Sequence, residues 1–203
     1  MHATWAISLA ADSPVLVVPW HDDAGLAAYV DLCARPDCME DIPEAVEHPS
    51  LARALAKLNA PDSPWLTAKC DRWTLDEDDL EAAALDLMLA RTKGFAQAGI
   101  GSYIDIYHRN SAEFAALERH RDLLPQLTRV AEGLAGEGVQ RDGHPAAMLE
   151  LTLRRCIVEG REGYAITAFL YAIGENPARA EANWAAALAA LTHILLKSDA
   201  PQR

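Results

Sequence analysis

Three segments of this chain alternate apolar side chains with polar or aromatic ones. They are residues 65–73, 102–108 and 147–158. Successive side chains of a β-strand point to opposite faces, so this pattern is typical of strands with one face on an apolar core. Each strand then has a second, mixed face. We therefore expect a sheet that packs helices against its apolar face and leaves the mixed face for another purpose.

The mixed faces carry aromatic rings and charges side by side. An unpaired charge is costly to bury, and a tryptophan is rarely left in water without a contact, so this combination needs an explanation. If the three strands are neighbours, the mixed faces merge into one patch. The candidate binding residues of this patch are Trp65, Lys69, Asp71, Trp73, Tyr103, Asp105, Tyr107, Glu150 and Arg154.

Several chemical roles stay open for the charged members of this patch. Two acids, Asp105 with either Asp71 or Glu150, have the types needed for an acid–base pair. Lys69 is a candidate Schiff-base nucleophile if it is desolvated, or the partner of a carboxylate in an ion pair. Arg154 has the geometry to clamp a carboxylate or phosphate, or to pair with a neighbouring acid. No catalytic residue is assigned.

The first third of the chain is expected to begin with a hairpin. Residues 4–9 and 14–20 flank a turn-forming Ala-Asp-Ser, and the second arm is apolar on both faces, which indicates a central strand. Asp22 or Asp23 is expected to cap a helix that ends at Pro36 and buries Leu26, Val30 and Cys33.

Later segments carry clear helix and turn signals. We expect an irregular loop over 35–49 and then a short helix that Ser50 caps and that buries Leu51, Leu55 and Leu58. Residues 74–79 open a helix that runs to about Arg91, and a long helix from Asn110 is kinked or split at Pro125. Residues 147–158 and 164–172 form a hairpin joined by 159–163. The final helix has Asn176 at its N-cap and Pro177 at its first position, and its buried stripe is Trp184, Leu188, Leu191 and Leu195.

Together these elements predict one α+β domain over residues 1–203. Its sheet is mostly antiparallel with five or six strands, and helices pack on one face. The order of elements also suggests an internal duplication with pseudo-repeats at 1–92 and 100–197, for which chance order in an alanine-rich chain is the alternative.

Charge and composition exclude several classes of protein. Thirty acidic and eighteen basic side chains give a formal net charge of −12, which repels phosphate backbones and anionic lipid, so we expect no nucleic-acid and no membrane partner. Four cysteines are few for this length, which favours a reducing, cytoplasmic setting. Cys33 and Cys38, with His21 and His48, lack the paired ligand spacing of a zinc site, so no metal and no cofactor is expected.

The function expected first is an acidic binding or interaction module, acting through the mixed sheet face on a protein partner or a second copy of itself. Proteins of opposite charge associate faster, so we expect the partner of this acidic protein to be basic. The alternative is an enzyme or sensor for a small polar organic molecule, with the same face as pocket floor. A pocket needs a hollow on the order of 300 Å³ with converging charges, whereas an interface needs a flat, exposed apolar patch. A third interpretation is a solvated face with cross-strand ion pairs.

Overall fold

The computed structural model describes residues 1–21, 28–87, 97–133, 140–141 and 144–198. A 3₁₀ helix at Pro36–Asp41 precedes the α-helices. The strands and α-helices, in chain order, are β1 (His2–Ser8), β2 (Leu16–Val18), α1 (Pro43–Glu47), α2 (Pro49–Leu58), β3 (Trp65–Thr74), α3 (Glu77–Asp86), β4 (Ala98–His108), α4 (Ser111–Ala115), α5 (Leu117–Gly133), β5 (Gln140–Arg141), β6 (His144–Pro145), β7 (Ala147–Val158), β8 (Arg161–Gly174) and α6 (Pro177–Ser198).

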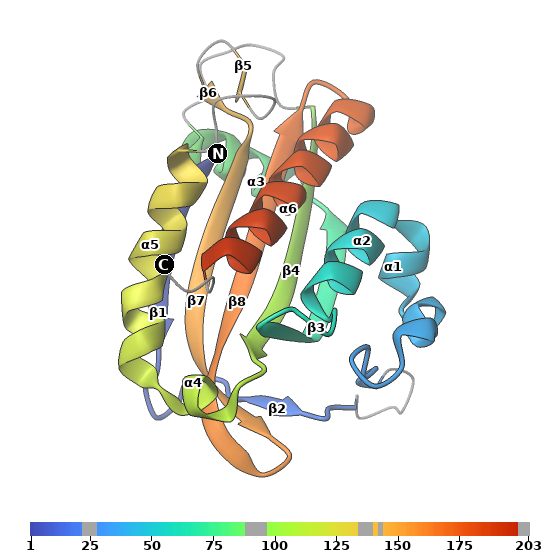
Figure 1. The fold of residues 1–203 in the computed structure, drawn as a ribbon. Coiled ribbons are helices and arrows are strands. Elements are labelled where there is room, and N and C mark those ends of the chain that lie inside the picture. Colours follow the sequence, from blue (N-terminus) through green and yellow to red (C-terminus); the bar gives the residue numbers. More distant parts are fainter. Residues whose placement is uncertain (22–27, 88–96, 134–139, 142–143, 199–203) are drawn as a thin grey trace.

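Six of these strands form one sheet in the order β1-β7-β8-β4-β3, with β2 on a further stretch of β7 (Figure 1). The pairs β7/β8, β8/β4 and β4/β3 are antiparallel. Strands β1 and β2 both run parallel to β7. The expected α+β class with a mostly antiparallel sheet is confirmed, and the sheet is mixed because of its first two strands.

The N-terminal hairpin prediction is wrong. Strand β1 pairs with the stretch of β7 from Met148 to Arg154, and β2 pairs with the stretch from Cys156 to Val158. Both strands run in the same direction along β7, so the turn between them, in which Ser13 N–H donates to the Ala10 carbonyl, displaces the chain without reversing it. The apolar second arm is therefore a short strand beside β7 rather than a central one.

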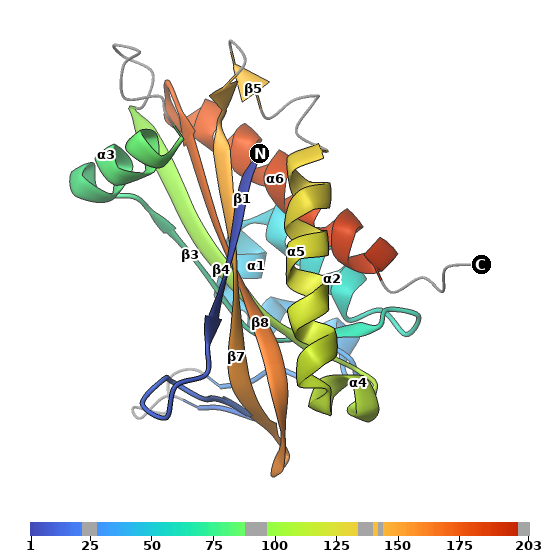
Figure 2. The ribbon, with the colours of Figure 1, turned by 90° about the vertical axis from the view of Figure 1, so that its left-hand side faces the viewer.

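One face of the sheet carries the main helical layer. In Figure 2 α5 and α6 lie together on one side of the sheet. Helix α6 packs on β8, α5 packs on β1 and β7, and α2 packs on α6 and β3. The apolar residues of β7 on this face, Leu149, Leu151 and Leu153, are fully buried against these helices. The predicted stripe of α6 is also buried: Trp184, Leu188, Leu191 and Leu195.

Helix α3 is the exception to the prediction that helices pack on one face. It lies on the opposite side of the sheet from α6 (Figure 2). Its Ala83 and Ala84, with Leu87 just after it, form a separate cluster with Ile173 and Tyr171 of β8. Alternation along β8 places these two residues opposite the face that α6 covers. One end of the mixed face is therefore roofed by a helix.

The caps predicted at Asn110 and Asn176 are confirmed by their hydrogen bonds, and Asp76 is the cap of α3. The cap predicted at Ser50 is wrong, because Ser50 lies inside α2 and the N-cap His48 makes no side-chain cap hydrogen bond. Asp76 accepts from the Asp79 N–H at 2.9 Å and Asn110 accepts from the Ala112 N–H at 2.8 Å. Asn176 accepts from Arg179 N–H at 2.9 Å. Each bond satisfies a backbone donor that the first turn of a helix leaves unpaired.

Two helix predictions are wrong in their boundaries. The long helix breaks at Ala116, which has extended backbone, while Pro125 lies inside α5. The break lets α4 stay at one end of the sheet while α5 turns along β1 and β7. The loop expected over 35–49 contains the 3₁₀ helix and α1.

The expected helix before Pro36 is not present in residues 28–35. Ala28 forms an isolated bridge with His21. Val30 has no regular secondary structure, and Cys33 lies in a turn. Leu26 and the capping Asp22 and Asp23 lie outside the described residues, as does the expected end of the third helix at Arg91.

The hairpin of β7 and β8 is confirmed. Glu159 and Gly160 form its two-residue turn with φ of 50° and 78°. Positive φ at both positions gives the turn type whose twist matches paired strands, and glycine adopts it without steric cost.

None of the helices in the described residues is long and apolar enough to cross a bilayer. The single-domain assignment and the duplication stay predictions.

Candidate functional site

Trp65 does not belong to the mixed face, contrary to the prediction. Its side chain is fully buried on the helical side, where the indole N–H donates to the Leu195 carbonyl of α6 at 2.9 Å. The cause is a β-bulge between Thr67 and Lys69, because an extra residue reverses the facing of every side chain beyond it. Before the bulge, Leu66 packs on the mixed side, although it was expected in the core.

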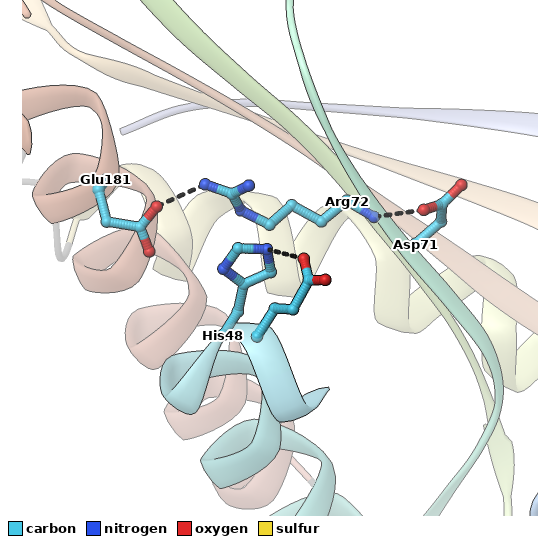
Figure 3. Close-up of polar contacts among 5 residues, drawn as sticks. His48, Asp71, Arg72 and Glu181 are labelled. Carbon is cyan, nitrogen blue, oxygen red and sulfur yellow. Dashed lines mark hydrogen bonds and ion pairs between the residues drawn. The ribbon is translucent and has the colours of Figure 1, made fainter. Parts of the chain in front are cut away.

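Beyond the bulge the predicted alternation holds. Arg72 reaches toward the helical layer and pairs with Glu181 of α6, while Asp71 leaves β3 on the other side (Figure 3). The Arg72 guanidinium also lies 5.2 Å from the Trp184 ring centroid. Asp71 accepts a hydrogen bond from the Arg72 backbone N–H at 2.7 Å. Lys69, Asp71 and Trp73 therefore share the mixed face.

The register of the sheet places the remaining predicted residues on this same face. Lys69 is directly opposite Asp105 across β3 and β4. Strand β8 lies between β4 and β7, so its Thr167 stands between Asp105 and Thr152. The predicted site strands are thus not all neighbours, and β8 supplies a further row of side chains to the face.

The two ends of the mixed face are covered. At the α3 end the Trp73 indole lies against Gly101 so closely that a Cβ there would be 2.4 Å from the ring. At the β2 end Tyr107 is buried beneath Val18, with its ring 6.0 Å from the ring of Phe114. Trp73 and Tyr107 therefore act as packing residues at the ends, and the middle of the face stays open.

The open middle contains a hollow of about 240 Å³. We call it the mid-face hollow; its lining residues are Pro14, Val15, Leu16, Lys69, Tyr103, Asp105, Arg154, Thr167 and Phe169. The segment 14–16 leads into β2, so the parallel course of β2 along β7 is what gives the hollow its wall. Four of the predicted residues, Lys69, Tyr103, Asp105 and Arg154, meet here.

Asp105 is the buried acid on the floor of this hollow. Only 6% of it is exposed, and the Thr167 hydroxyl donates to its carboxylate. Burial raises the pKa of the Asp105 carboxyl, whereas the Thr167 hydrogen bond and the positive charges of Arg154 and Lys69 act in the opposite direction. The raised pKa means that desolvation outweighs these favourable contacts.

The two cations of the hollow are held by aromatic rings. The Lys69 ammonium lies 4.9 Å from the Trp20 ring centroid, and the Arg154 guanidinium lies 5.5 Å from that of Phe169. Trp20 is fixed by its indole N–H, which donates to the Ala68 carbonyl at 2.7 Å. Such contacts orient a cation without neutralising its charge.

A second hollow of about 540 Å³ lies beside the first. We call it the edge hollow because it lies along β3, the last strand of the sheet, and shares Lys69 and Tyr103 with the mid-face hollow. Its walls include Trp20 and Leu55. Its charged lining residues are Arg35, Asp41, Glu44, Lys69 and Asp71.

The remaining acids do not join Asp105 as a catalytic pair. Asp71 is exposed and lines the edge hollow only. Glu150 lies on the mixed face but accepts a hydrogen bond from the Thr152 hydroxyl at 3.1 Å and lines neither hollow. The nearby Cys70 points to the helical side, and burial raises the pKa of its thiol to about 12, which disfavours a nucleophilic thiolate.

Sequence reasoning missed the residues that β8 and the N-terminal segment contribute. Thr167 and Phe169 line the mid-face hollow, and Trp20 lines the edge hollow. Alternation along 164–172 puts Thr167 and Phe169 opposite Ile166 and Ala168, so this signal was available in the sequence. Nothing in the sequence indicated that 14–16 would fold over the sheet.

Among the described residues, no group of three or more His, Cys, Asp or Glu side chains is placed to hold a metal ion. Comparisons with protein-family models, with curated proteins and with solved structures give no significant match to this chain.

Proposed function

We propose that the protein binds a small polar organic molecule on the mixed face of its sheet, as a sensor or binding module. The observation that carries this proposal is the convergence of Lys69, Asp105 and Arg154 on one hollow. A few convergent polar groups between apolar walls are what small-ligand sites have in common. The hollow brings in one carboxylate and no second acid to complete an acid–base pair, so binding is favoured over catalysis.

The shape of the face favours a small ligand over a large protein surface. An interface needs a flat apolar patch, but the middle of this face is hollowed and its ends are covered. The large apolar side chains that are exposed include Trp5 and Ile7 of β1, which lie at the other edge of the sheet.

Fragment mapping by NMR tests this proposal. With the ¹⁵N-labelled protein and a library of small polar fragments, we expect hits whose chemical-shift changes centre on Lys69, Tyr103, Asp105 and Arg154. A variant that fills the hollow from its wall, Val15→Trp, should lose those hits while keeping its thermal unfolding. Hits that centre elsewhere, or none across the library, would reject the proposal.

A second candidate function is self-association through β1. This strand pairs with β7 and ends the sheet, and its Trp5 and Ile7 are 45% and 40% exposed. A free strand edge with apolar side chains beside it is a template for pairing with another chain. Self-association was expected through the mixed face, and we now propose that it uses the edge of β1.

The β1 proposal predicts a concentration-dependent dimer. Light scattering after size exclusion should give the wild-type protein a mass above the 22.1 kDa of one chain at high concentration. The Trp5→Glu variant should be a monomer, because the two added carboxylates would repel each other where the β1 strands of two copies pair. Val46→Glu serves as the control, since Val46 is 61% exposed on α1. A monomer at every concentration contradicts this candidate.

A further inference from the structure

We propose that the mid-face hollow selects a small organic carboxylate, a monoanion with a single-ring or short aliphatic body. This inference rests on the proposed function and names its ligand class. The lining carries two cations, Lys69 and Arg154, against one acid, Asp105. The lining of the hollow therefore has one excess positive charge, whereas the whole protein has a formal net charge of −12.

The two cations of the mid-face hollow share one carboxylate, the buried Asp105, and both charges act to lower the pKa of that group. Neither Lys69 nor Arg154 takes part in the ion pairs found among the described residues. The Arg154 Nε is shielded from solvent and has no hydrogen-bond partner among those residues. Two cations that share a single buried acid, with one guanidinium nitrogen left without a hydrogen-bond partner, leave room for a second anion. Their aromatic contacts leave N–H donors available to a carboxylate.

The adjoining edge hollow has the opposite balance. Arg35 and Lys69 face three acids there, Asp41, Glu44 and Asp71, so its lining carries one excess negative charge. An anion is therefore directed to the mid-face hollow and not to the larger space next to it. This difference in sign makes the location of the carboxylate testable.

The rest of the lining sets the body of the ligand. Phe169, Leu16 and Val15 provide an apolar wall, and Tyr103 adds an aromatic ring. A volume of about 240 Å³ corresponds to roughly eight water molecules at about 30 Å³ each. A carboxylate attached to one ring, such as phenylacetate, fits this space and this wall.

Titration with three molecules of one shape and different charge tests the inference. Phenylacetate, phenylacetamide and phenethylamine share their ring and differ in whether the head group is an anion, neutral or a cation. We expect NMR titration of the wild type to show phenylacetate binding at least tenfold more tightly than the other two, with shifts at Lys69 and Arg154. Arg154→Gln should weaken phenylacetate at least tenfold, and Asp105→Asn should tighten it because a like charge is removed.

Arg155→Gln is the matched control. Arg155 is the next residue of β7 and so points to the opposite face, and its change alters the net charge equally. It should leave phenylacetate affinity unchanged. Equal affinity for phenylacetamide, preference for phenethylamine, or equal losses in the two arginine variants would each overturn the carboxylate assignment. If the fragment hits still centre on the hollow, the proposed function survives that result; if they do not, both fail.

Discussion

Replacing Trp65 by alanine is expected to lower the free energy of unfolding by about 3–5 kcal/mol, which is the usual range for a fully buried tryptophan. Trp65 has no exposed surface, and its indole N–H donates to Leu195 at the C-terminal end of α6. The variant loses the packing between β3 and the helical layer and the indole hydrogen bond to that carbonyl, which then accepts from the Ser198 hydroxyl alone among its side-chain donors. Urea unfolding followed by circular dichroism measures the loss.

Trp73→Ala is the matched control for Trp65→Ala. Both tryptophans lie in β3, but Trp73 is half-buried on the mixed face, with ring neighbours Tyr103 and Tyr171. We expect this variant to cost about 1 kcal/mol. If Trp65→Ala fails to fold, Trp65→Phe keeps one aromatic ring but loses part of the buried volume and the N–H donor, and it should still cost more than Trp73→Ala. Equal losses in the two tryptophan variants would contradict the bulge as the cause of their opposite facing.

Replacing Asp105 by asparagine is expected to stabilise the protein at neutral pH by about 1–2 kcal/mol, the scale at which single substitutions commonly stabilise. Burial raises the pKa of this carboxyl above its ordinary value of 3.8, so the folded state disfavours the charged form. Asparagine keeps the acceptor for the Thr167 hydroxyl and removes the charge. Urea unfolding at pH 7 measures the gain.

The stabilisation by Asp105→Asn should depend on pH in one direction. Below the ordinary pKa of 3.8 the carboxyl is protonated in both the folded and the unfolded state, so wild type and variant should be equally stable. As the pH rises from 3.8 through the higher pKa of the folded state, the folded protein holds the proton longer than the unfolded chain. The wild type loses stability relative to the variant over this window, and the difference is constant above it.

A destabilised Asp105→Asn variant at pH 7 would mean that the charges of Lys69 and Arg154 outweigh the desolvation of the carboxylate. The control is Asp71→Asn, because Asp71 is exposed beside the same lysine. It should change the free energy of unfolding by less than about 0.5 kcal/mol. A stabilising Asp105→Asn, with Asp71→Asn neutral, would assign the cost to the burial of the Asp105 charge and not to its position beside Lys69.

Local signals in the sequence predicted much of the fold. Asn110 and Asn176 marked helix starts, and the acidic residues of 74–79 marked the start of α3. Such signals are local, because the side-chain acceptor of a cap lies within three residues of the backbone donor that it bonds. The hairpin turn at Glu159 and Gly160 was likewise local. Alternation placed Lys69, Tyr103, Asp105 and Arg154 on one kind of face, and the structure brings these four together.

The errors concern contacts between distant parts of the chain. The bulge in β3 reverses Trp65, and the alternation of a single strand gives no sign of where a partner strand will skip a residue. The parallel course of β1 and β2 depends on β7, which follows them by more than a hundred residues. A turn signal between two apolar segments does not say whether they pair with each other or with a third.

Most strands, several helix starts, and the side chains of β3 beyond the bulge, β4 and β7 that share the mixed face could therefore be predicted from the chain alone, because side-chain alternation and capping act between near neighbours along the chain. Only the tertiary structure decided that α3 and β2 cover the ends of that face, that β8 adds Thr167 and Phe169 to it, and that two cations and one buried acid surround a hollow. Packing between distant segments sets these features, and it depends on the shape and charge of both partners at once.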